Sequence, residues 1–514
     1  MSQEGLIVPP VGVEPDERPP APPAQGPDPK RWLALAVIAV AQLMIILDAS
    51  IVNIALPDAA ADLGISQANL QWVVTAYTLA FGGLLLLGGR IADFMGRKRA
   101  FIIALIGFAV ASGLGGIAPN EALLYVARAG QGAFAALMAP AALSLLTITF
   151  TDPKERAKAF GVFGAISGGG AAIGLILGGV LTEYASWRWT LGVNVPIALA
   201  AAVAAVPLVK ESRAEGDRHF DIPGVLLSAV GLVSLVYGFT KAAEEGVGWG
   251  DPLTITLLVV AAVLLTAFAV WETRTSHPLL PTRVILDRVR GGSYLLFLLV
   301  GAGLFAMFLF LTLYFQETLG YTPLEAGWAF LPFSGGIILG AGVVSQLLPR
   351  VGPRPLMLVG LVMAVVGMFS LTRIEAGADS SYATQVLPAM LLLSLGLAAV
   401  FVPTASTALV GVEPRDSGIA SAVLNTAQQV GGSLGLAILT TIFSSSVTGW
   451  FADKGARLAT DPAFAATAEA EAMVSGYHTA FLAAAGILAV ALVVAFALIN
   501  AKKEDLPAEG AIAA

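Results

Sequence analysis

The sequence has no cysteine and few charged residues. Without cysteine it can form no disulfides, no thiolate metal sites and no cysteine nucleophile. Charged residues make up 12% of the 514 residues and hydrophobic residues 57%, a balance that cannot cover a water-soluble surface. These deficits exclude a soluble enzyme and indicate a protein that lies in a membrane.

Histidine is scarce too, and no nucleotide-binding motif is present. His219, His277 and His478 each fall in a loop or near the end of an apolar run. No G-x-x-x-x-G-K-[ST] loop occurs to cradle phosphates. We therefore expect no catalytic residue, no metal, no cofactor and no nucleic-acid partner.

The apolar residues form runs that are long enough to cross a ~30 Å bilayer core as helices, and too long for barrel strands. Most of the 56 glycines fall within these runs, as in closely packed membrane helices. The expected fold class is an all-α polytopic membrane protein with fourteen transmembrane helices, embedded in a lipid bilayer. The runs cover about residues 31–56, 69–92, 101–118, 121–149, 158–182, 187–209, 222–240, 252–271, 291–316, 325–348, 355–372, 384–410, 417–446 and 477–500.

The basic residues predict the orientation. An even number of spans places both termini on one side, and 22 of the 28 Lys and Arg fall on that side, five fall on the other, and Arg128 lies inside a span. The positive-inside rule therefore predicts cytoplasmic termini. The Ala-, Gly- and Val-rich composition suggests a bacterium, and hence its inner membrane.

A weak repeat predicts the domains. The stretch Gly89–Arg99 after the second run resembles Ser345–Pro355 after the tenth, 256 residues later, and the same offset carries Arg31 to Asp287. Two six-helix halves with two inserted helices are expected. The expected parts are a disordered Pro-rich cytoplasmic tail (1–30), an N-terminal bundle (31–209), a linker with the two extra helices (210–290), a C-terminal bundle (291–500) and a second cytoplasmic tail (501–514).

Four stretches carry a resemblance to the major facilitator superfamily and its fourteen-span drug/proton antiporter branch. Leu47–Pro57 resembles the first-helix motif of that branch, and Arg128–Ala136 resembles its fourth-helix motif. The signature loop is represented by Gly89, Asp93, Gly96, Arg97, Lys98 and Arg99, and the antiporter glycine motif by Gly161, Gly170, Gly174, Gly178 and Gly179. One departure is Leu175, which stands where the motif has proline.

The resemblance implies a proton-coupled multidrug exporter in the cell membrane, working by alternating access, that confers antibiotic resistance and is no enzyme. Its substrates would be lipophilic or cationic drugs or natural products, and one monomer would suffice. A proton-coupled or facilitative metabolite permease is the alternative, since Leu175 permits it. A membrane scaffold or sensor is a third possibility, for which an added soluble domain would be expected.

Two charged residues fall clearly within spans, where charge is costly and usually marks a pathway. Counting 1.5 Å per residue places Asp48, Arg128 and Tyr77 in one layer, about 10–12 Å below the outer ends of their helices. Burial disfavours a charged carboxylate and a nearby guanidinium favours it. We predict that Asp48 carries the proton and that Arg128 modulates it; the alternative is a permanent ion pair that only fixes helix register.

The substrate cavity is expected between the halves, near the membrane midplane. Aromatic faces with few polar groups would suit amphipathic molecules, and ordinary helix packing is the alternative. The predicted lining residues are Tyr77, Gln131, Phe305, Phe308, Tyr314, Asn425, Gln428 and Gln429. We also expect Asp93 to hold the two halves together on the cytoplasmic side. The alternative is that the neighbouring basic residues only fix the membrane topology. We assign no role to the outer loop 449–476.

Overall fold

The computed structural model describes residues 29–150, 152–212, 221–243, 247–276, 278–280, 282–376, 380–412 and 417–505. These residues form helices and no strand. Most of both predicted tails (1–28 and 506–514) lies outside them, as do His219 and His277.

The first part of the chain contains α1 (Arg31–Leu63), α2 (Gln67–Leu70), α3 (Trp72–Met95), α4 (Arg97–Gly116), α5 (Glu121–Thr149), α6 (Pro153–Tyr184), α7 (Trp189–Gly192), α8 (Asn194–Leu208), α9 (Ile222–Ala243) and α10 (Pro252–Arg274). The second part contains α11 (Thr282–Ile285), α12 (Arg288–Leu313), the π-helix η1 (Tyr314–Thr318), α13 (Pro323–Ala329), α14 (Leu331–Val351), α15 (Pro353–Ser370), the short helices η2 (Leu371–Arg373) and η4 (Tyr382–Val386), α16 (Leu387–Thr407), α17 (Ser417–Thr460), α18 (Pro462–Leu498) and η6 (Lys503–Asp505).

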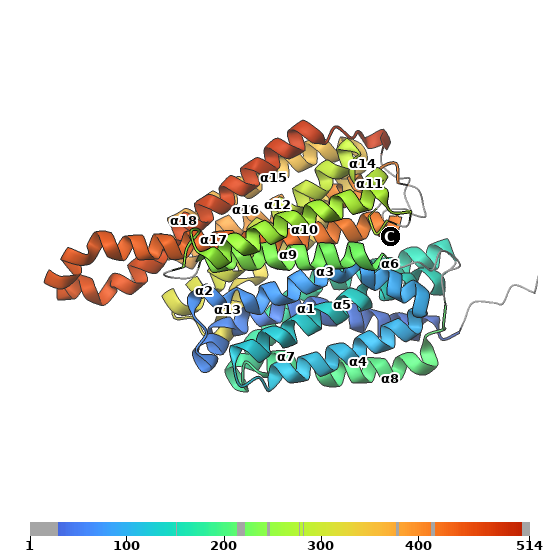
Figure 1. The fold of residues 1–514 in the computed structure, drawn as a ribbon, viewed down its shortest axis with the longest axis horizontal. Helices are drawn as coiled ribbons and strands as arrows, with labels where there is room; N and C mark the ends of the chain where they lie inside the picture. The colour runs from blue at the N-terminus through green and yellow to red at the C-terminus, as the bar shows by residue number, and fades with distance from the viewer. Residues whose placement is uncertain are drawn as a thin grey trace, which may run out of the picture.

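The helices are those of a multi-pass membrane protein. Twelve of the described helical segments are long and apolar enough to cross a bilayer, and α3 and α6 contribute two shorter apolar stretches, Trp72–Leu85 and Gly170–Tyr184. The long helices run side by side, and the start of α1 and the end of α18 lie at the same end of the molecule (Figure 1). We call this the terminal end, and the opposite end the distal end.

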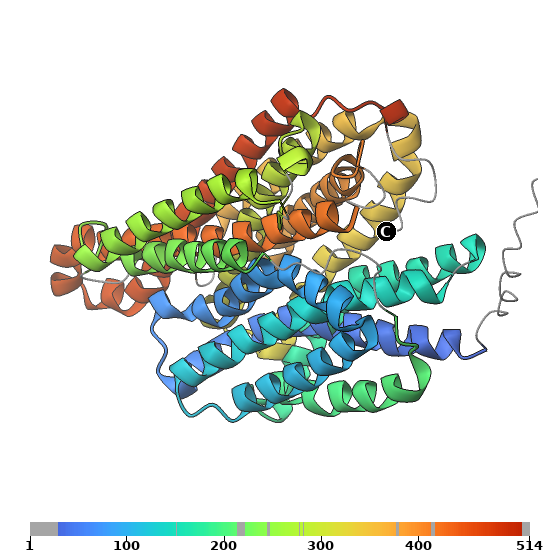
Figure 2. The same ribbon diagram turned by 45° about the vertical axis from the view of Figure 1, so that its right-hand side comes forward.

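The long helices pack as two sets. Helices α1, α3, α4, α5, α6 and α8 pack with one another, as do α12 and α14–α18, and the sets diverge toward the terminal end (Figure 2). Close approaches recur in both sets: Gly174 of α6 faces Leu47 and Ser50 of α1, and Gly431 of α17 faces Leu298 of α12. A side chain at either glycine would clash with the facing helix, so both glycines set the helix spacing.

Matching turns end α3 and α14. Gly96 and Gly352, 256 residues apart, have φ of 107° and 87°, which favours glycine. Two residues after each glycine, a basic side chain donates to a backbone carbonyl of the last long helix of its set: Lys98 Nζ to Val206 O (2.6 Å) and Arg354 Nη2 to Phe496 O (2.8 Å). The weak sequence repeat therefore corresponds to a repeated local structure.

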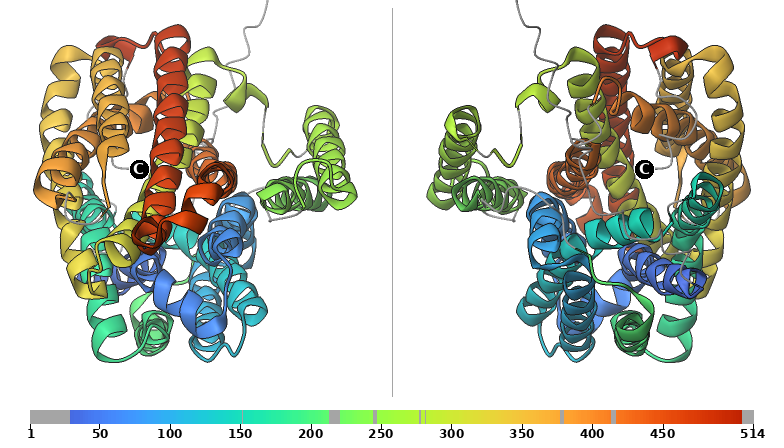
Figure 3. Two further views of the ribbon diagram at one scale, coloured as in Figure 1. Left: turned by 90° about the vertical axis from the view of Figure 1, so that its left-hand side faces the viewer. Right: turned by 90° about the vertical axis from the view of Figure 1, so that its right-hand side faces the viewer.

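The α9–α10 hairpin lies at the periphery, away from the bodies of the two sets (Figure 3). Helix α9 packs on α3 and α17, one helix from each set. Most of α10 is not covered by protein, because only 11% of its most apolar stretch is buried. Such an apolar, uncovered helix is suited to contact lipid.

The predicted outer loop 449–476 is not a loop. Helix α17 continues to Thr460 and α18 begins at Pro462, so the pair projects beyond the other helices at the distal end (Figure 1). Asp461 caps α18 by accepting a hydrogen bond from the Phe464 N–H (3.1 Å), and Pro462 occupies the first turn. The Asp-Pro start and the alanine-rich sequence are strong helix signals, so the loop expectation was wrong.

Candidate functional site

A buried ion pair lies within the first helix set. Arg128 Nη1 of α5 donates to Asp48 Oδ2 of α1 at 2.6 Å, and both side chains are 0% exposed. The guanidinium also donates from Nε to the Val73 carbonyl of α3 (2.8 Å). The pair thus joins three helices, and its charges are shielded from lipid by protein.

Neutral polar groups complete the network around Asp48. Gln131 Nε2 donates to Asp48 Oδ1 (2.8 Å) and to Ser112 Oγ (2.7 Å), while its Oε1 accepts from Arg128 (2.8 Å). Asn194 Nδ2 of α8 donates to the same Oδ1 at 2.8 Å. The carboxylate therefore has three donors, as a buried charge requires. Ser112 and Asn194 were not predicted from the sequence, although an asparagine in an apolar run is itself a signal.

Arg128 retains an unused donor group. Its Nη2 is buried and has no hydrogen-bond partner, although a guanidinium has five N–H donors. On one side the guanidinium is covered by the ring of Tyr77, whose centroid is 4.6 Å from Cζ. The Tyr77 ring in turn stacks on Phe81, with centroids 5.9 Å apart and planes inclined by 28°.

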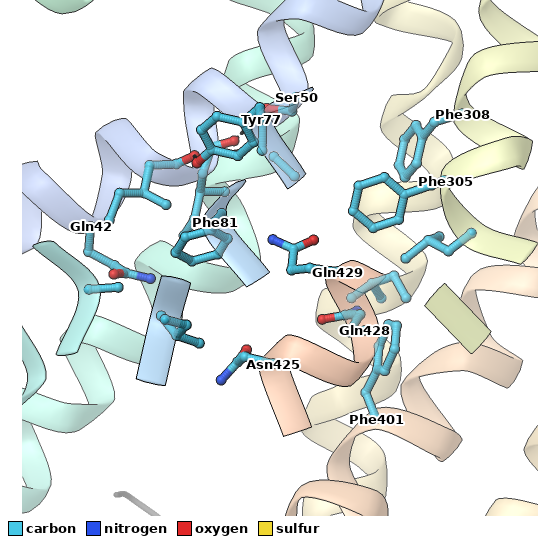
Figure 4. Close-up of a pocket in the computed structure, with 18 of the residues that line it drawn as sticks. Gln42, Ser50, Tyr77, Phe81, Phe305, Phe308, Phe401, Asn425, Gln428 and Gln429 are labelled. Carbon is cyan, nitrogen blue, oxygen red and sulfur yellow. Dashed lines mark hydrogen bonds between the residues drawn. The ribbon is translucent and has the colours of Figure 1, made fainter. Parts of the chain in front are cut away.

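A cavity of about 580 Å³ lies between the two helix sets. Figure 4 shows Gln42, Ser50, Tyr77 and Phe81 on one side and Phe305, Phe308, Phe401, Asn425, Gln428 and Gln429 on the other. No residue in its described lining carries a charge. Asp48 and Arg128 are not part of that lining; Tyr77 and Phe81 are. The cavity and the ion pair are therefore adjacent but separate.

Most of the predicted lining residues meet at this cavity. Tyr77, Phe305, Phe308, Asn425, Gln428 and Gln429 line it. Gln131 does not, because it points into the Asp48 network. Tyr314 does not either: it lies in the π-helical turn after α12, where its hydroxyl donates to the Glu375 carbonyl (2.9 Å). Gln42, Phe81 and Phe401 line the cavity but were not predicted. Nothing in the sequence distinguishes the two phenylalanines from packing residues, whereas Gln42, a polar residue within an apolar run, was a signal.

The glycines of α6 lie against two different partners. Gly170, Gly174 and Gly178 face α1 around Ile46, Ser50 and Ile51, beside the ion-pair layer. Gly179 faces Leu324 of α13 instead, and Gly327 of α13 faces the carbonyl of Leu175. The surroundings of Gly161 lie outside the described residues. One face of α6 therefore packs on α1 around the level of Asp48, and another joins the two sets.

The contacts that join the sets lie at mid-depth and toward the distal end. Leu324 N–H donates to Glu183 Oε2 (3.2 Å), and Gln316 Nε2 donates to the Ile54 carbonyl (2.9 Å). Thr78 and Ser433 share a hydrogen bond of 2.7 Å between α3 and α17. On α1 and α12 the cavity residues precede these contacts in the chain, on the terminal side of them.

The signature loop contacts its own set. Glu211, beyond α8, accepts from the Lys98 N–H (3.1 Å), lies 3.7 Å from Arg99 Nε, and faces Gly96. The Arg97 N–H donates to the Ser212 carbonyl (2.9 Å). Gly89 is in ordinary contact with Pro140. The side chain of Asp93 lies outside the described residues, so its latch role stays a prediction.

The chain is similar to named bacterial resistance and export proteins. It is 49% identical over 481 residues to a puromycin resistance protein of Streptomyces alboniger, covering 93% of both chains. It is 40% identical to a cephamycin export protein of Amycolatopsis lactamdurans (81% and 86% covered) and 37% identical to a lincomycin resistance protein of Streptomyces lincolnensis (80% and 84% covered).

A solved structure shares the fold. A bacterial homologue of the human lysosomal transporter Spinster, in an inward-facing and unoccupied conformation, superposes with a TM-score of 0.65 at 16% identity, covering 94% of this chain and all of that one. The family description "Major Facilitator Superfamily" matches residues 38–436. Together with the helical fold and the cavity between two helix sets, this match shows that the chain belongs to the Major Facilitator Superfamily of membrane transporters.

Proposed function

We propose that this protein is a proton-coupled antiporter that exports natural products or drugs from a bacterial cell. The observation that carries the proposal is the Asp48–Arg128 pair, buried directly behind a cavity between two helix sets. A single buried carboxylate with a conditional cationic partner can take up and release one proton. The relatives named for antibiotic resistance and export support outward transport.

The cavity favours aromatic molecules that carry several hydrogen-bonding groups. Its wall offers the carboxamides of Gln42, Asn425, Gln428 and Gln429 among phenylalanine rings, with no fixed charge. Carboxamides both donate and accept, and rings stack on planar groups. Cationic substrates would be held by ring faces rather than by a carboxylate in the wall.

We further propose fourteen spans with cytoplasmic termini. Twelve helical segments are long and apolar enough to cross a bilayer, and the shorter apolar stretches of α3 and α6 bring the number to fourteen. Each helix contacts neighbours within its set. The bundles 31–209 and 291–500 then form two halves around the cavity, with 210–290 as the insert. The terminal end, where the halves diverge, would face the cytoplasm, so substrate would enter from inside the cell.

Proton release on ligand binding tests this proposal. Puromycin would be added to the purified protein in weakly buffered detergent solution, and the released protons measured for wild type and for Asp48→Asn. We expect release from wild type, and binding without release from the variant. Equal release from both would show that Asp48 is not the proton carrier; binding to wild type without any release would overturn antiport for this ligand.

Flux direction separates export from the permease alternative. In proteoliposomes with an imposed pH gradient, an antiporter moves puromycin against the direction of proton flow. Movement with the proton flow would favour a symporting metabolite permease.

A further inference from the structure

Tyr77 stands between the cavity and the proton site. Its ring is 1% exposed, lines the cavity and covers the Arg128 guanidinium. Phe81, one helical turn further along α3, stacks on Tyr77 and presents its own ring to the cavity. A continuous series of groups therefore runs from the cavity through Phe81, Tyr77 and Arg128 to Asp48.

The position of the Tyr77 ring is set by packing rather than by a strong hydrogen bond. Its hydroxyl is 3.5 Å from the Ile45 carbonyl, at the limit of a hydrogen bond. Gly132 of α5 brings that helix against the α3 backbone, since a Cβ there would lie 2.2 Å from the Tyr77 carbonyl oxygen. The backbone of Tyr77 is thus fixed, while little holds its ring except the surfaces it touches.

Arg128 is able to take a second arrangement. Its Nη2 is buried without a partner, so the guanidinium does not use all of its donors in this one. Two of the described groups around Asp48 are charged or titratable, Arg128 of α5 and Tyr77 of α3. The others are neutral: Ser112 of α4, Gln131 of α5 and Asn194 of α8. The charge balance at Asp48 therefore depends on the position of one guanidinium.

The geometry points to Tyr77 as the positioning residue that transmits occupancy of the cavity to Asp48. An aromatic substrate that stacks on Phe81 extends the series of rings and holds Tyr77 on Arg128. Arg128 then stays on Asp48, which favours the carboxylate, and the proton leaves. When the substrate departs, Tyr77 is free to swing toward the cavity, Arg128 loses its cover, and Asp48 reloads.

This inference rests on the proposed antiport, and linkage provides its test. If binding expels one proton, puromycin affinity rises with pH by about tenfold per pH unit across the titration of Asp48. The dissociation constant would be measured between pH 5 and pH 9 for wild type, Tyr77→Leu, Tyr77→Phe and Asp48→Asn in detergent. We expect a steep pH dependence in wild type and Tyr77→Phe, and a nearly flat one in Tyr77→Leu.

A merely structural role would weaken binding of the Tyr77→Leu variant equally at every pH and leave the slope unchanged, which would overturn the inference. A flat wild-type profile, or a steep Asp48→Asn profile, would instead overturn the proposed antiport. If Tyr77→Leu does not fold, Phe81→Leu removes the next ring while leaving the cover on Arg128. A slope at least halved in Phe81→Leu supports the series of rings, and an unchanged slope refutes it.

Discussion

The two helix sets bury different chemistry, although they repeat the same packing. The first set buries a charged pair with amide partners, including Asp48, Arg128, Gln131 and Asn194. The polar side-chain groups buried in the described part of the second set are hydroxyls of serine, threonine and tyrosine, and several serine and threonine hydroxyls bond to a carbonyl of their own helix, as Thr404 does to Val400. A hydroxyl satisfied within its own helix needs no further partner, so movement of the second set breaks few buried side-chain bonds, such as Thr78–Ser433 between the sets.

The second set instead packs aromatic residues at its distal side. Phe310 stacks on Phe443 with centroids 5.2 Å apart, and Tyr477 contacts both rings. Three of its amide side chains, Asn425, Gln428 and Gln429, lie on the cavity wall. The comparison teaches that one set buries the charged pair proposed to carry the proton, whereas the other contributes most of the carboxamides in the cavity wall and a packed aromatic cluster.

The largest expected effect comes from removing the charge of the first set. Asp48→Asn should lower pH-gradient-driven puromycin accumulation in proteoliposomes by more than about 100-fold, because intramembrane carboxylates of this kind carry the coupled ion. Thr404→Val, which removes a buried hydroxyl of the second set, is the matched control and should keep most of the activity. Similar losses in both variants would break the comparison.

Arg128→Met tests the pair from its other side. It leaves Asp48 buried without a counter-charge, which typically destabilises a protein by about 3–5 kcal/mol. Thermal unfolding should show a larger loss at pH 8 than at pH 5, where protonation removes the charge. The double variant Asp48→Asn, Arg128→Met should recover much of this loss; no recovery would mean that Arg128 stabilises through other contacts.

Asn425→Leu tests recognition by the second set. Asn425 lies on the cavity wall and its Nδ2 donates to the Ser421 carbonyl (3.0 Å). The substitution should weaken puromycin binding by about three- to tenfold, the size of one lost hydrogen bond, with the pH dependence of binding unchanged. A changed slope would show that the second set also takes part in coupling.

Phe443→Leu should have the smallest effect on transport. It shrinks the aromatic cluster, so a loss of about 1–2 kcal/mol in stability is expected from the missing packing. Transport assayed well below the melting temperature should stay within twofold of wild type. A strong transport defect in a well-folded variant would place this cluster in the mechanism.

The sequence predicted the depth of Asp48, Arg128 and Tyr77 well, because depth in a membrane helix follows from residue counting; their role in proton coupling stays a prediction. Asp48, Arg128 and Tyr77 were placed in one layer by their distances from helix ends, and the structure brings them together. Membership of the superfamily, expected from the motif resemblance, was confirmed. The predicted number of fourteen spans stays a prediction, because twelve of the described segments are long and apolar enough to cross a membrane.

The face of a helix was harder to predict than its depth. Gln131 has the right depth and residue type but points away from the cavity, into the Asp48 network. Tyr314 lies beyond the cavity residues of α12, and its hydroxyl bonds to the Glu375 carbonyl. In helices that are apolar all round, hydrophobic periodicity does not separate a face that meets another helix from one that meets a cavity. The place of Tyr77 between the cavity and the ion pair likewise depends on three-dimensional packing.

Because α17 is unbroken, the distal tip of the α17–α18 hairpin should move together with the cavity residues of the second set. The cavity residue Gln429 and the interset contact Ser433 lie on the same helix as Thr460 near the hairpin tip. From Ser433 to Thr460 the helix extends about 40 Å, so a 10° tilt at the cavity would displace the tip by about 7 Å. A fluorophore pair with one dye on this tip would therefore magnify a small rearrangement around the substrate into a measurable change in energy transfer.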